Sequence, residues 1–432
     1  MSETSLSRDW MVPDDLRDWT IDIFDTLYRQ SFDGVGVSRA TYGDGETKAM
    51  EVIANRADQE GLEVSYDAAA NLIISLPGEA PDQPFVACGS HLDSVPEGGN
   101  FDGAAGVIAG LLSLVQLRRK GVTPPRTIKV MGLRGEESAW FGHCYLGSRA
   151  LFGGLEPEDM TLPHRTTGDP LIDYMRTAGA DVQQLQSGNA ILKPQDIACF
   201  FELHIEQGPV MIARGIPVGI VTGIRGNNRH PDASCTGEAA HSGAVPRWLR
   251  HDTVFAASEL ITRLDRHWQA LLEQGEDLVV TVGIIGTNPD EHAMSRVPGH
   301  INFSLEYRSQ SKELLREFEE LVHDEARIIQ RLRKVSFDLG APVETEPAMM
   351  DDRLVNHLSG VCQKLDIDHE QLPSGAGHDA AIFANEGVPS VMIFVRNENG
   401  SHNPDEAMEF DDFFLGTEVL LNGMLTAPEA LI

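Results

Sequence analysis

Apolar and polar positions along the first part of the chain predict helices and strands in turn. Residues 14–30 and 45–60 carry apolar side chains at helical spacing, and residues 103–119 form a longer, mostly apolar helical segment. Short apolar or β-branched runs, bounded by Gly, Pro or polar residues, predict strands at 71–76, 85–88 and 127–132. This alternation is typical of a largely parallel α/β sheet, in which ligands gather beyond the carboxyl ends of the strands. The polar residues that directly follow 85–88, where Gly89-Ser90-His91 ends the strand, and 127–132 are therefore candidates for chemistry.

A further strand is predicted at 197–205, and its period of two places Glu202, His204 and Glu206 on one face. From about residue 215 the pattern changes. Strands are predicted there at 216–222, 232–236, 277–285 and 300–307, and two long helices at 252–274 and 311–332.

The α/β pattern returns after about residue 344, with a helix near 353–365, an apolar strand at 390–394 and a final helix. We therefore expect one α/β domain, formed by 1–214 and 344–432, interrupted by an α+β insert at 215–343.

The charge of the chain narrows the possible partners. Asp and Glu number 66 against 34 Lys and Arg, so the formal net charge of the 432 residues is −32. An acidic surface repels nucleic acids and anionic membranes, and it leaves small-molecule chemistry open. We expect neither a nucleic-acid partner nor a membrane partner.

The cysteines and the apolar runs indicate a cytoplasmic protein. Five widely spaced cysteines without a CxxC pair are typical of reduced thiols (Cys88, Cys144, Cys199, Cys235 and Cys362). The charged first residues lack the apolar run of a signal peptide. The longest apolar stretch, 104–117, has about half the length of a bilayer span and is expected to be a buried helix.

Five Gly-rich segments place metal-capable side chains at or after predicted strands. They are GSHLDSVPEGGNFDGAAG with His91, Asp93 and Asp102; RGEESAWFG with Glu136 and Glu137; ELHIEQG with Glu202, His204, Glu206 and Gln207; SGAGHDA with His378 and Asp379; and NGSHNPDE with His402. A hydrolase that activates water at neutral pH needs imidazole and carboxylate ligands and an open position for water. Three His, a bridging Asp and one Glu could hold two metal ions, and a second Glu could act as general base.

Each of these residues, taken alone, has a simpler structural interpretation. A His or Asp after a strand often satisfies backbone amides or caps a helix. Asp102 could be only the N-cap of the helix at 103–119, and Asp93 only a turn residue. Five such segments in a chain with 15 His favour the metal interpretation.

These strings resemble those of the zinc-dependent aminoacylase/carboxypeptidase superfamily. Within it they are similar to the hydantoinase/carbamoylase branch, which contains N-carbamoyl-L-amino acid hydrolases, allantoate amidohydrolases and β-ureidopropionases. The resemblance covers about residues 35–425, and it is strongest in GSHLDSVPEGGNFDGAAGV, ELHIEQGPV, GEAAHSG and PSGAGHDA. It implies a parallel-sheet dimetal hydrolase domain with an inserted lid and dimerisation domain.

The resemblance also implies roles for single residues. His91, Asp102 and His402 would hold one metal ion, and Asp102, Glu137 and His204 the other. Two divalent ions per subunit are implied, Zn²⁺ first, with Mn²⁺ or Co²⁺ able to share such N/O sites. Asp93 would fix the tautomer of His91, and Glu136 would be the general base.

The remaining implied roles concern the substrate and the dimer. Gln207, Arg308 and His378 would contact a small anionic substrate, although Arg308 could be a surface residue and the backbone at 375–377 could bind an anion without His378. The insert would form the homodimer and lend His241 to the partner's active site, unless His241 is an ordinary loop residue. Ser295 replaces the Asn that, in the family, helps Arg308 grip the substrate carboxylate. This change, with Arg296 and Arg396 nearby in the pattern, points to a second substrate carboxylate or another polar group, unless both Arg side chains face solvent.

The implied reaction is hydrolysis of a linear C–N bond in an N-carbamoyl or N-acyl amino acid or a ureido acid. Two alternatives stay open. A dizinc dipeptidase or aminoacylase of the same superfamily is disfavoured by Gln207 in HIEQG, a string of the carbamoylase branch. A non-catalytic binding protein on the same fold is disfavoured by the intact Glu136 and the complete ligand set.

Overall fold

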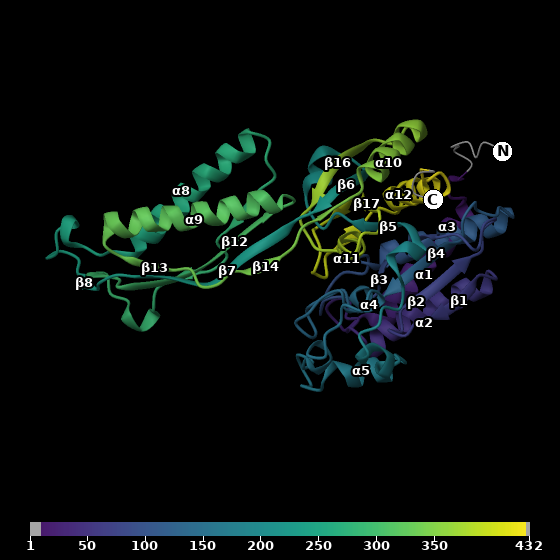
Figure 1. Cartoon of the computed structure of the whole chain (residues 1–432), viewed down its shortest axis with the longest axis horizontal. Helices are drawn as coiled ribbons and strands as arrows, with labels where there is room; N and C mark the ends of the chain where they lie inside the picture. Colours follow the sequence, from purple (N-terminus) through teal and green to yellow (C-terminus); the bar gives the residue numbers. More distant parts are fainter. Residues whose placement is uncertain (1–9, 429–432) are drawn as a thin grey trace. The chain divides into compact units, whose positions relative to one another are not determined.

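The computed structural model describes residues 10–428 and contains two compact units (Figure 1). The main unit comprises Met1–Gly223 and Met349–Ile432, and the inserted unit comprises Ile224–Ala348. The run predicted at 216–222 is strand β6 (Val218–Ile224), which pairs with β17 (Ser390–Val395) in the main sheet. The inserted unit therefore begins and ends later than the 215–343 expected from the sequence pattern.

The main unit is built on a nine-stranded sheet whose centre is parallel. The strand order is β1-β2-β4-β3-β5-β17-β6-β15, with β16 paired to β6. The neighbours β4, β3, β5 and β17 are parallel, whereas the pairs β1–β2, β2–β4 and β17–β6 are antiparallel. The other strand bounds are β1 Glu63–Tyr66, β2 Leu72–Leu76, β3 Phe85–His91, β4 Ile128–Leu133, β5 Ile197–Ile205, β15 Ala348–Met349 and β16 His369–Ser374. This sheet confirms the predicted parallel-rich α/β fold.

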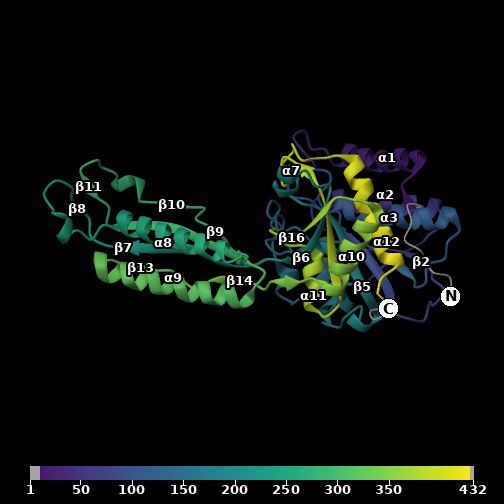
Figure 2. The ribbon, with the colours of Figure 1, turned by 90° about the horizontal axis from the view of Figure 1, so that it is seen from above.

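The main unit also contains helices. They are α1 (Asp14–Ser31), α2 (Asp44–Gln59), α3 (Ala104–Lys120), α4 (Leu146–Leu151), α5 (Leu171–Thr177), α6 (Val182–Gln186), α7 (Val210–Arg214), α10 (Asp352–Leu365), α11 (Asp379–Asn385) and α12 (Phe410–Leu425). Figure 2 shows α3 and α12, which contact each other, alongside the strands. The short helices α4 to α6 fall in a region for which the sequence pattern predicts no element.

Helix α3 is the buried centre of the main unit. Every residue from Ala104 to Leu117 is buried, as expected for a helix that is apolar on all sides. Gly106 lets its backbone approach β5, because a Cβ there would lie 2.2 Å from the carbonyl oxygen of Leu203. The close packing of α3 on β5 therefore keeps Asp102, which precedes the helix, near the ends of the strands.

The inserted unit is an antiparallel sheet covered by two helices, as the predicted α+β insert implies. Its strand order is β10-β12-β7-β13, with β14 paired to β7 and β9 to β12, and α8 (Thr253–Glu273) and α9 (Lys312–Arg333) pack on it. The strand bounds are β7 Gly226–Thr236, β9 Val279–Thr281, β10 Ile285–Gly286, β12 His300–Ser309, β13 Ser336–Asp338 and β14 Val343–Thr345. Asp252 and Ser311 cap the two helices, each accepting a backbone N–H from its first turn.

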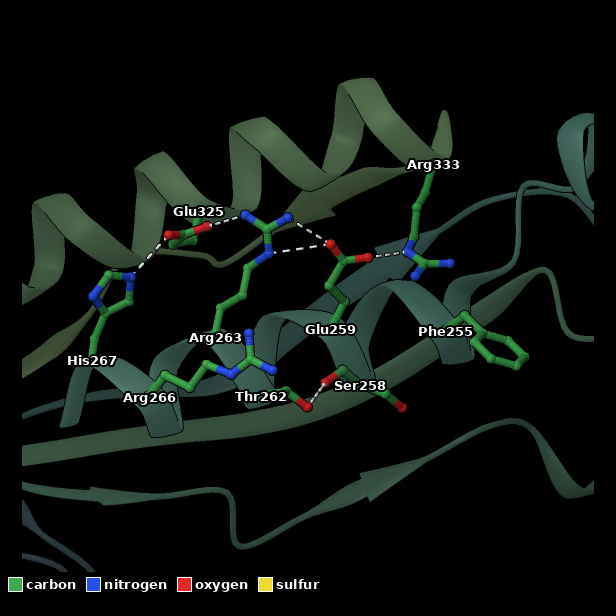
Figure 3. A pocket seen from close by; sticks show the side chains of 9 residues that line it. All are labelled: Phe255, Ser258, Glu259, Thr262, Arg263, Arg266, His267, Glu325 and Arg333. Carbon is green, nitrogen blue, oxygen red and sulfur yellow. Dashed lines mark hydrogen bonds and ion pairs between the residues drawn. The ribbon is translucent and has the colours of Figure 1, made fainter. Parts of the chain in front are cut away.

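An ion-pair network joins α8 to α9 (Figure 3). Arg263 bonds to Glu259 on its own helix at 2.6 Å and to Glu325 on α9 at 2.8 Å. His267 lies 3.0 Å from Glu325, and Arg333 pairs with Glu259. These pairs are partly exposed, so each contributes little to the stability of the fold.

Three other expectations can be compared with the structure. Strand β3 does not end before Gly89, since the ladder with β4 continues through Ser90 to His91. All five cysteines are free thiols, and four of them are buried. Between residues 10 and 428, no helix is long and apolar enough to cross a membrane.

Candidate metal centre

The strand ends of the main sheet bring the predicted metal ligands together. His91 is the last residue of β3, and His204 is the penultimate residue of the neighbouring strand β5. Glu136 and Glu137 follow β4, and Asp102 lies two residues before the start of α3. His402 comes from the loop between the short paired strands β18 (Asn397–Glu398) and β19 (Ala407–Met408).

Asp102 lies at the centre of the cluster and faces both sides of it. Its Oδ1 is 3.4 Å from Nε2 of His91 and 3.1 Å from Nε2 of His204. Its Oδ2 is 3.4 Å from Nε2 of His402, which also lies 3.3 Å from Oε1 of Glu137. Asp102 caps no helix with its side chain, because the N-cap of α3 is Gly103 at φ 64°.

These contacts define two candidate metal groups that share Asp102. One is His91, Asp102 and His204, and the other is Asp102, Glu137 and His402. The five residues are those named from the sequence, but the grouping implied by the resemblance, His402 with His91 and His204 with Glu137, differs from the geometry. The reason is strand order, since His91 and His204 sit on adjacent strands.

The donor set fits two divalent cations. Each group offers imidazole nitrogen and carboxylate oxygen, and three protein ligands leave positions for water or substrate. Burial favours a higher pKa for Asp102, yet the imidazoles of His204, His402 and His91 pull it well below its usual range. Hydrogen bonds to Asp102 and Glu137 raise the pKa of His402 to about 11. The surrounding imidazoles therefore stabilise the ionised form of Asp102.

Glu136 and Glu137 occupy different positions, as expected for a general base and a metal ligand. Glu137 faces His402, whereas Glu136 belongs to neither metal group and its Oε2 lies 3.9 Å from Nε2 of His91. Burial raises the pKa of Glu136 well above its usual value, although His91 opposes this effect. Glu136 is thus a carboxylate that accepts a proton readily.

Asp93 contacts both His91 and the turn that carries the two glutamates. Its Oδ1 is 3.3 Å from Nδ1 of His91 and accepts the backbone N–H of Glu136 at 3.1 Å. Its Oδ2 accepts the backbone N–H of Glu137 at 3.2 Å and the hydroxyl of Thr41 at 2.6 Å. One buried carboxylate therefore orients His91, Glu136 and Glu137 together.

The bridging carboxylate has further partners. The side-chain amide of Gln207 donates to Oδ2 of Asp102 at 2.7 Å, and the Ser401 hydroxyl lies 2.6 Å from the same oxygen. Glu406 accepts the backbone N–H groups of Phe101 and Asp102 at 2.8 and 3.2 Å. Sequence reasoning missed Ser401 and Glu406, although both lie in the NGSHNPDE segment that revealed His402.

Two further residues of the five segments, His378 and Glu202, are also buried. His378 is 1% exposed, packs edge-on against His204 with ring centroids 4.5 Å apart, and lies 2.9 Å from the Ser374 hydroxyl. Burial lowers its pKa well below the usual value, so its imidazole is neutral. Glu202 accepts hydrogen bonds from Ser90 and from the backbone of Ala380, a structural role.

The inserted unit holds the other predicted residues. His241 lies on β8 (Ala240–His241) opposite Arg296 of β11 (Arg296–Val297), and it is exposed. The carbonyl of Ser295 accepts the backbone N–H of Ser242, and Arg308 on β12 bonds to Glu306 at 2.9 Å. The approach of these residues to the metal centre stays a prediction.

The two arginines that suggested a second substrate carboxylate have partners of their own. Arg296 pairs with Glu291 at 2.6 Å, and Arg396 pairs with Asp412 at 2.7 Å. These ion pairs favour a structural role for both side chains. Arg308 also has a carboxylate partner, Glu306, so its contact with a substrate carboxylate stays a prediction.

Fold and site together define the class of protein: a hydrolase with a parallel-rich α/β unit, an inserted α+β unit and a shared-carboxylate metal centre. The chain belongs to the peptidase family M20/M25/M40, whose model matches residues 87–425, and within it to the hydantoinase/carbamoylase branch. Members of this family depend on metal ions.

Relatives of known name lie in the same branch. An allantoate amidohydrolase of Escherichia coli is 33% identical over 387 residues, 89% of this chain and 91% of that protein. An N-carbamoyl-L-amino acid amidohydrolase of Geobacillus stearothermophilus is 34% identical over 89% of this chain and 92% of its own length. The crystal structure of a hydantoinase/carbamoylase family amidase from Burkholderia ambifaria, 27% identical, superimposes with a TM-score of 0.84 over 95% of this chain and 97% of that one.

Proposed function

We propose that this amidohydrolase cleaves the linear C–N bond of a small anionic N-carbamoyl or N-acyl amino acid, or of a ureido acid. The observation that carries the proposal is the adjacent glutamate pair, in which Glu137 joins a metal group and Glu136 stands outside both. The names of the relatives above support carbamoyl and ureido substrates.

The metal ions would be held by the two groups that share Asp102. When bound, they would polarise the substrate carbonyl and lower the pKa of a water molecule. Zn²⁺ suits this set of imidazole and carboxylate ligands, and Mn²⁺ and Co²⁺ accept the same donors.

The residues of the chain supply proton transfer and orientation. Glu136 removes a proton from the attacking water and then donates it to the leaving nitrogen, as general base and general acid in turn. Because burial raises its pKa, the protonated carboxyl that forms between these two steps is stable. Asp93 holds the Glu136 backbone and the His91 ring in place during both steps.

The substrate contacts and the dimer are part of the same proposal. Arg308 binds the substrate carboxylate bidentately, Ser295 takes the place of the Asn of the family, and Gln207 and His378 complete the site. The inserted unit forms a homodimer, and His241 of the partner subunit stabilises the developing oxyanion. The free acceptor of Gln207, whose Oε1 is buried without a partner in the described part of the chain, supports a substrate that carries N–H donors.

A hydrolysis screen tests the proposal. The purified protein, stripped with a chelator and reloaded separately with Zn²⁺, Mn²⁺ or Co²⁺, is offered carbamoyl, formyl, acetyl and ureido acids and a set of dipeptides. We expect turnover of a carbamoyl or ureido acid, with the Glu136→Gln variant inactive at equal metal content. Turnover of dipeptides alone would instead make the chain a dipeptidase, and inactivity of every metal-loaded form would favour a binding protein.

A further inference from the structure

Tyr145 adopts a backbone conformation that is rare for a bulky residue. Its φ is 62° and its ψ is 32°, in the left-handed region, directly before the first residue of α4. Aromatic residues avoid this region, and such outliers cluster at functional sites. The Tyr145 N–H donates to the carbonyl oxygen of Glu136 at 3.1 Å, so the strained residue is tied to the proposed base.

The side chain of Tyr145 reaches across to the SGAGHDA segment. An ideal Cβ built on Gly377 would lie 1.8 Å from the Tyr145 hydroxyl oxygen and 3.1 Å from the nearest ring carbon. A side chain at residue 377 would therefore require the Tyr145 hydroxyl to move. Tyr145 therefore spans the space between the glutamate turn and the loop that leads to His378.

The Tyr145 hydroxyl is available to a ligand. The ring is half-buried, and within residues 10–428 the hydroxyl has no hydrogen-bond partner. Burial raises the pKa of Tyr145 well above its usual value, and the nearby carboxylates of Glu136 and Asp379 add to this effect. The phenol is thus a proton donor at neutral pH, surrounded by groups that it does not bond.

We propose that Tyr145 is a substrate-binding residue, whose hydroxyl donates a hydrogen bond to an oxygen of the bound substrate beside Glu136. This inference rests on the proposed hydrolysis. This role accounts for three observations: the left-handed backbone of Tyr145, its hydroxyl without a hydrogen-bond partner in the described residues, and the glycine at position 377. A tyrosine with a purely structural role would use its hydroxyl in a hydrogen bond within the protein. If only its ring packed, Phe would serve equally well.

The position of the hydroxyl is tested by stability alone. We expect Gly377→Ala to lower the melting temperature, because its Cβ would overlap the hydroxyl oxygen. Adding Tyr145→Phe removes that oxygen and should restore part of the loss. If Tyr145→Phe brings no recovery in the Gly377→Ala background, the hydroxyl does not lie where the proposal needs it.

The contact itself is tested by binding to an inactive enzyme. Substrate affinity is measured by calorimetry for Glu136→Gln and for Glu136→Gln combined with Tyr145→Phe, both metal-loaded. We expect about a three- to tenfold loss of affinity, the usual effect of losing one neutral hydrogen bond. Tyr174→Phe is the matched control, because its hydroxyl contacts Thr167 at 3.0 Å and belongs to no candidate site.

Kinetics separate this proposal from the reaction that it assumes. If wild type turns over none of the screened compounds, the proposed hydrolysis fails, whatever Tyr145 does. If wild type is active and Tyr145→Phe matches it in both kcat and KM on every substrate, Tyr145 makes no substrate contact. A lower kcat for Tyr145→Phe would mean that the hydrogen bond strengthens in the transition state. A higher KM alone would mean that the hydrogen bond contributes to substrate binding. Either result supports the contact.

Discussion

Asp93 is a single carboxylate that positions several residues of the candidate metal centre. It contacts the imidazole of His91 and accepts the backbone N–H groups of both Glu136 and Glu137. Asp102, in turn, is held by Gln207 and by the Ser401 and Glu406 pair. Residues outside the two candidate metal groups therefore orient the side chains of those groups through hydrogen bonds.

The two adjacent glutamates should respond oppositely to the same substitution. Glu136→Gln should keep two metal ions per chain and lose about 10²–10⁴-fold in kcat, the usual cost of a lost general base. Glu137→Gln should lose metal, because it removes a carboxylate of one metal group. Metal content by plasma emission spectrometry and turnover are measured on both variants. A Glu136→Gln protein that loses metal, or one that keeps a near-normal rate, would mean that the roles are exchanged.

Arg308 should act as a bidentate carboxylate clamp that Lys cannot replace. Arg308→Lys should lower kcat/KM by at least about tenfold, or about 1.4 kcal/mol, on substrates with a free α-carboxylate. The matching α-amide should be cleaved much less well than the acid by wild type. Equal cleavage of acid and amide, together with a silent Arg308→Lys, would remove the clamp from the proposal. Ser295→Asn, measured in parallel, reports whether the change from Asn to Ser at this position alters substrate preference.

At the scale of elements, the contact between α3 and β5 holds the bridging carboxylate in place. Gly106 of α3 lies against the backbone of Leu203, one residue before the ligand His204. Asp102 lies two residues before α3, and the backbone N–H of the intervening Gly103 donates to Nε2 of His204 at 3.2 Å. Helix–sheet distance and ligand geometry are therefore coupled.

Two glycine-to-alanine changes in helices should have opposite signs. Gly106→Ala should destabilise the main unit by about 1–3 kcal/mol, because the new Cβ overlaps the Leu203 carbonyl and forces the helix outward. Gly360→Ala in α10 meets nothing within 4 Å and should stabilise by up to about 1 kcal/mol through helix propensity. Denaturant unfolding monitored by circular dichroism compares the two. Equal effects would show that α3 can shift away from β5 without strain.

At the scale of the whole molecule, the proposal requires each active site to use two subunits. The metal groups belong to the main unit, whereas His241 and Arg308 belong to the inserted unit. The inserted unit presents several exposed apolar side chains, among them Trp248 at 73% and Phe255 at 60%. Such side chains are common at subunit interfaces and support the proposed homodimer.

Mixed subunits test the shared site directly. Glu136→Gln and His241→Ala proteins, each inactive, are unfolded together, refolded and reloaded with metal. In a mixed dimer one of the two sites combines an intact Glu136 with an intact His241, so random pairing should restore about a quarter of wild-type activity. Analytical ultracentrifugation confirms the dimer. Confirmed subunit exchange without any recovered activity would mean that His241 does not act across the subunits.

The sequence alone determined the types of element and the chemistry at their ends. Strand β5 has the predicted bounds, and the residues of the two candidate metal groups are those that the sequence indicates, His91, Asp102, Glu137, His204 and His402. Both follow from local properties, because side-chain periodicity selects helix or strand and Gly-rich turns after strands leave polar side chains at the sheet edge.

Only the tertiary structure decided which of these residues meet. Chain order does not reveal that β3 lies between β4 and β5, yet this order places His91 beside His204 and leaves Glu137 to pair with His402. The same holds for Tyr145, whose hydroxyl meets a glycine 232 positions later in the chain. Contacts between distant segments depend on strand order and on the close packing of backbones, and neither leaves a periodic signal in the sequence.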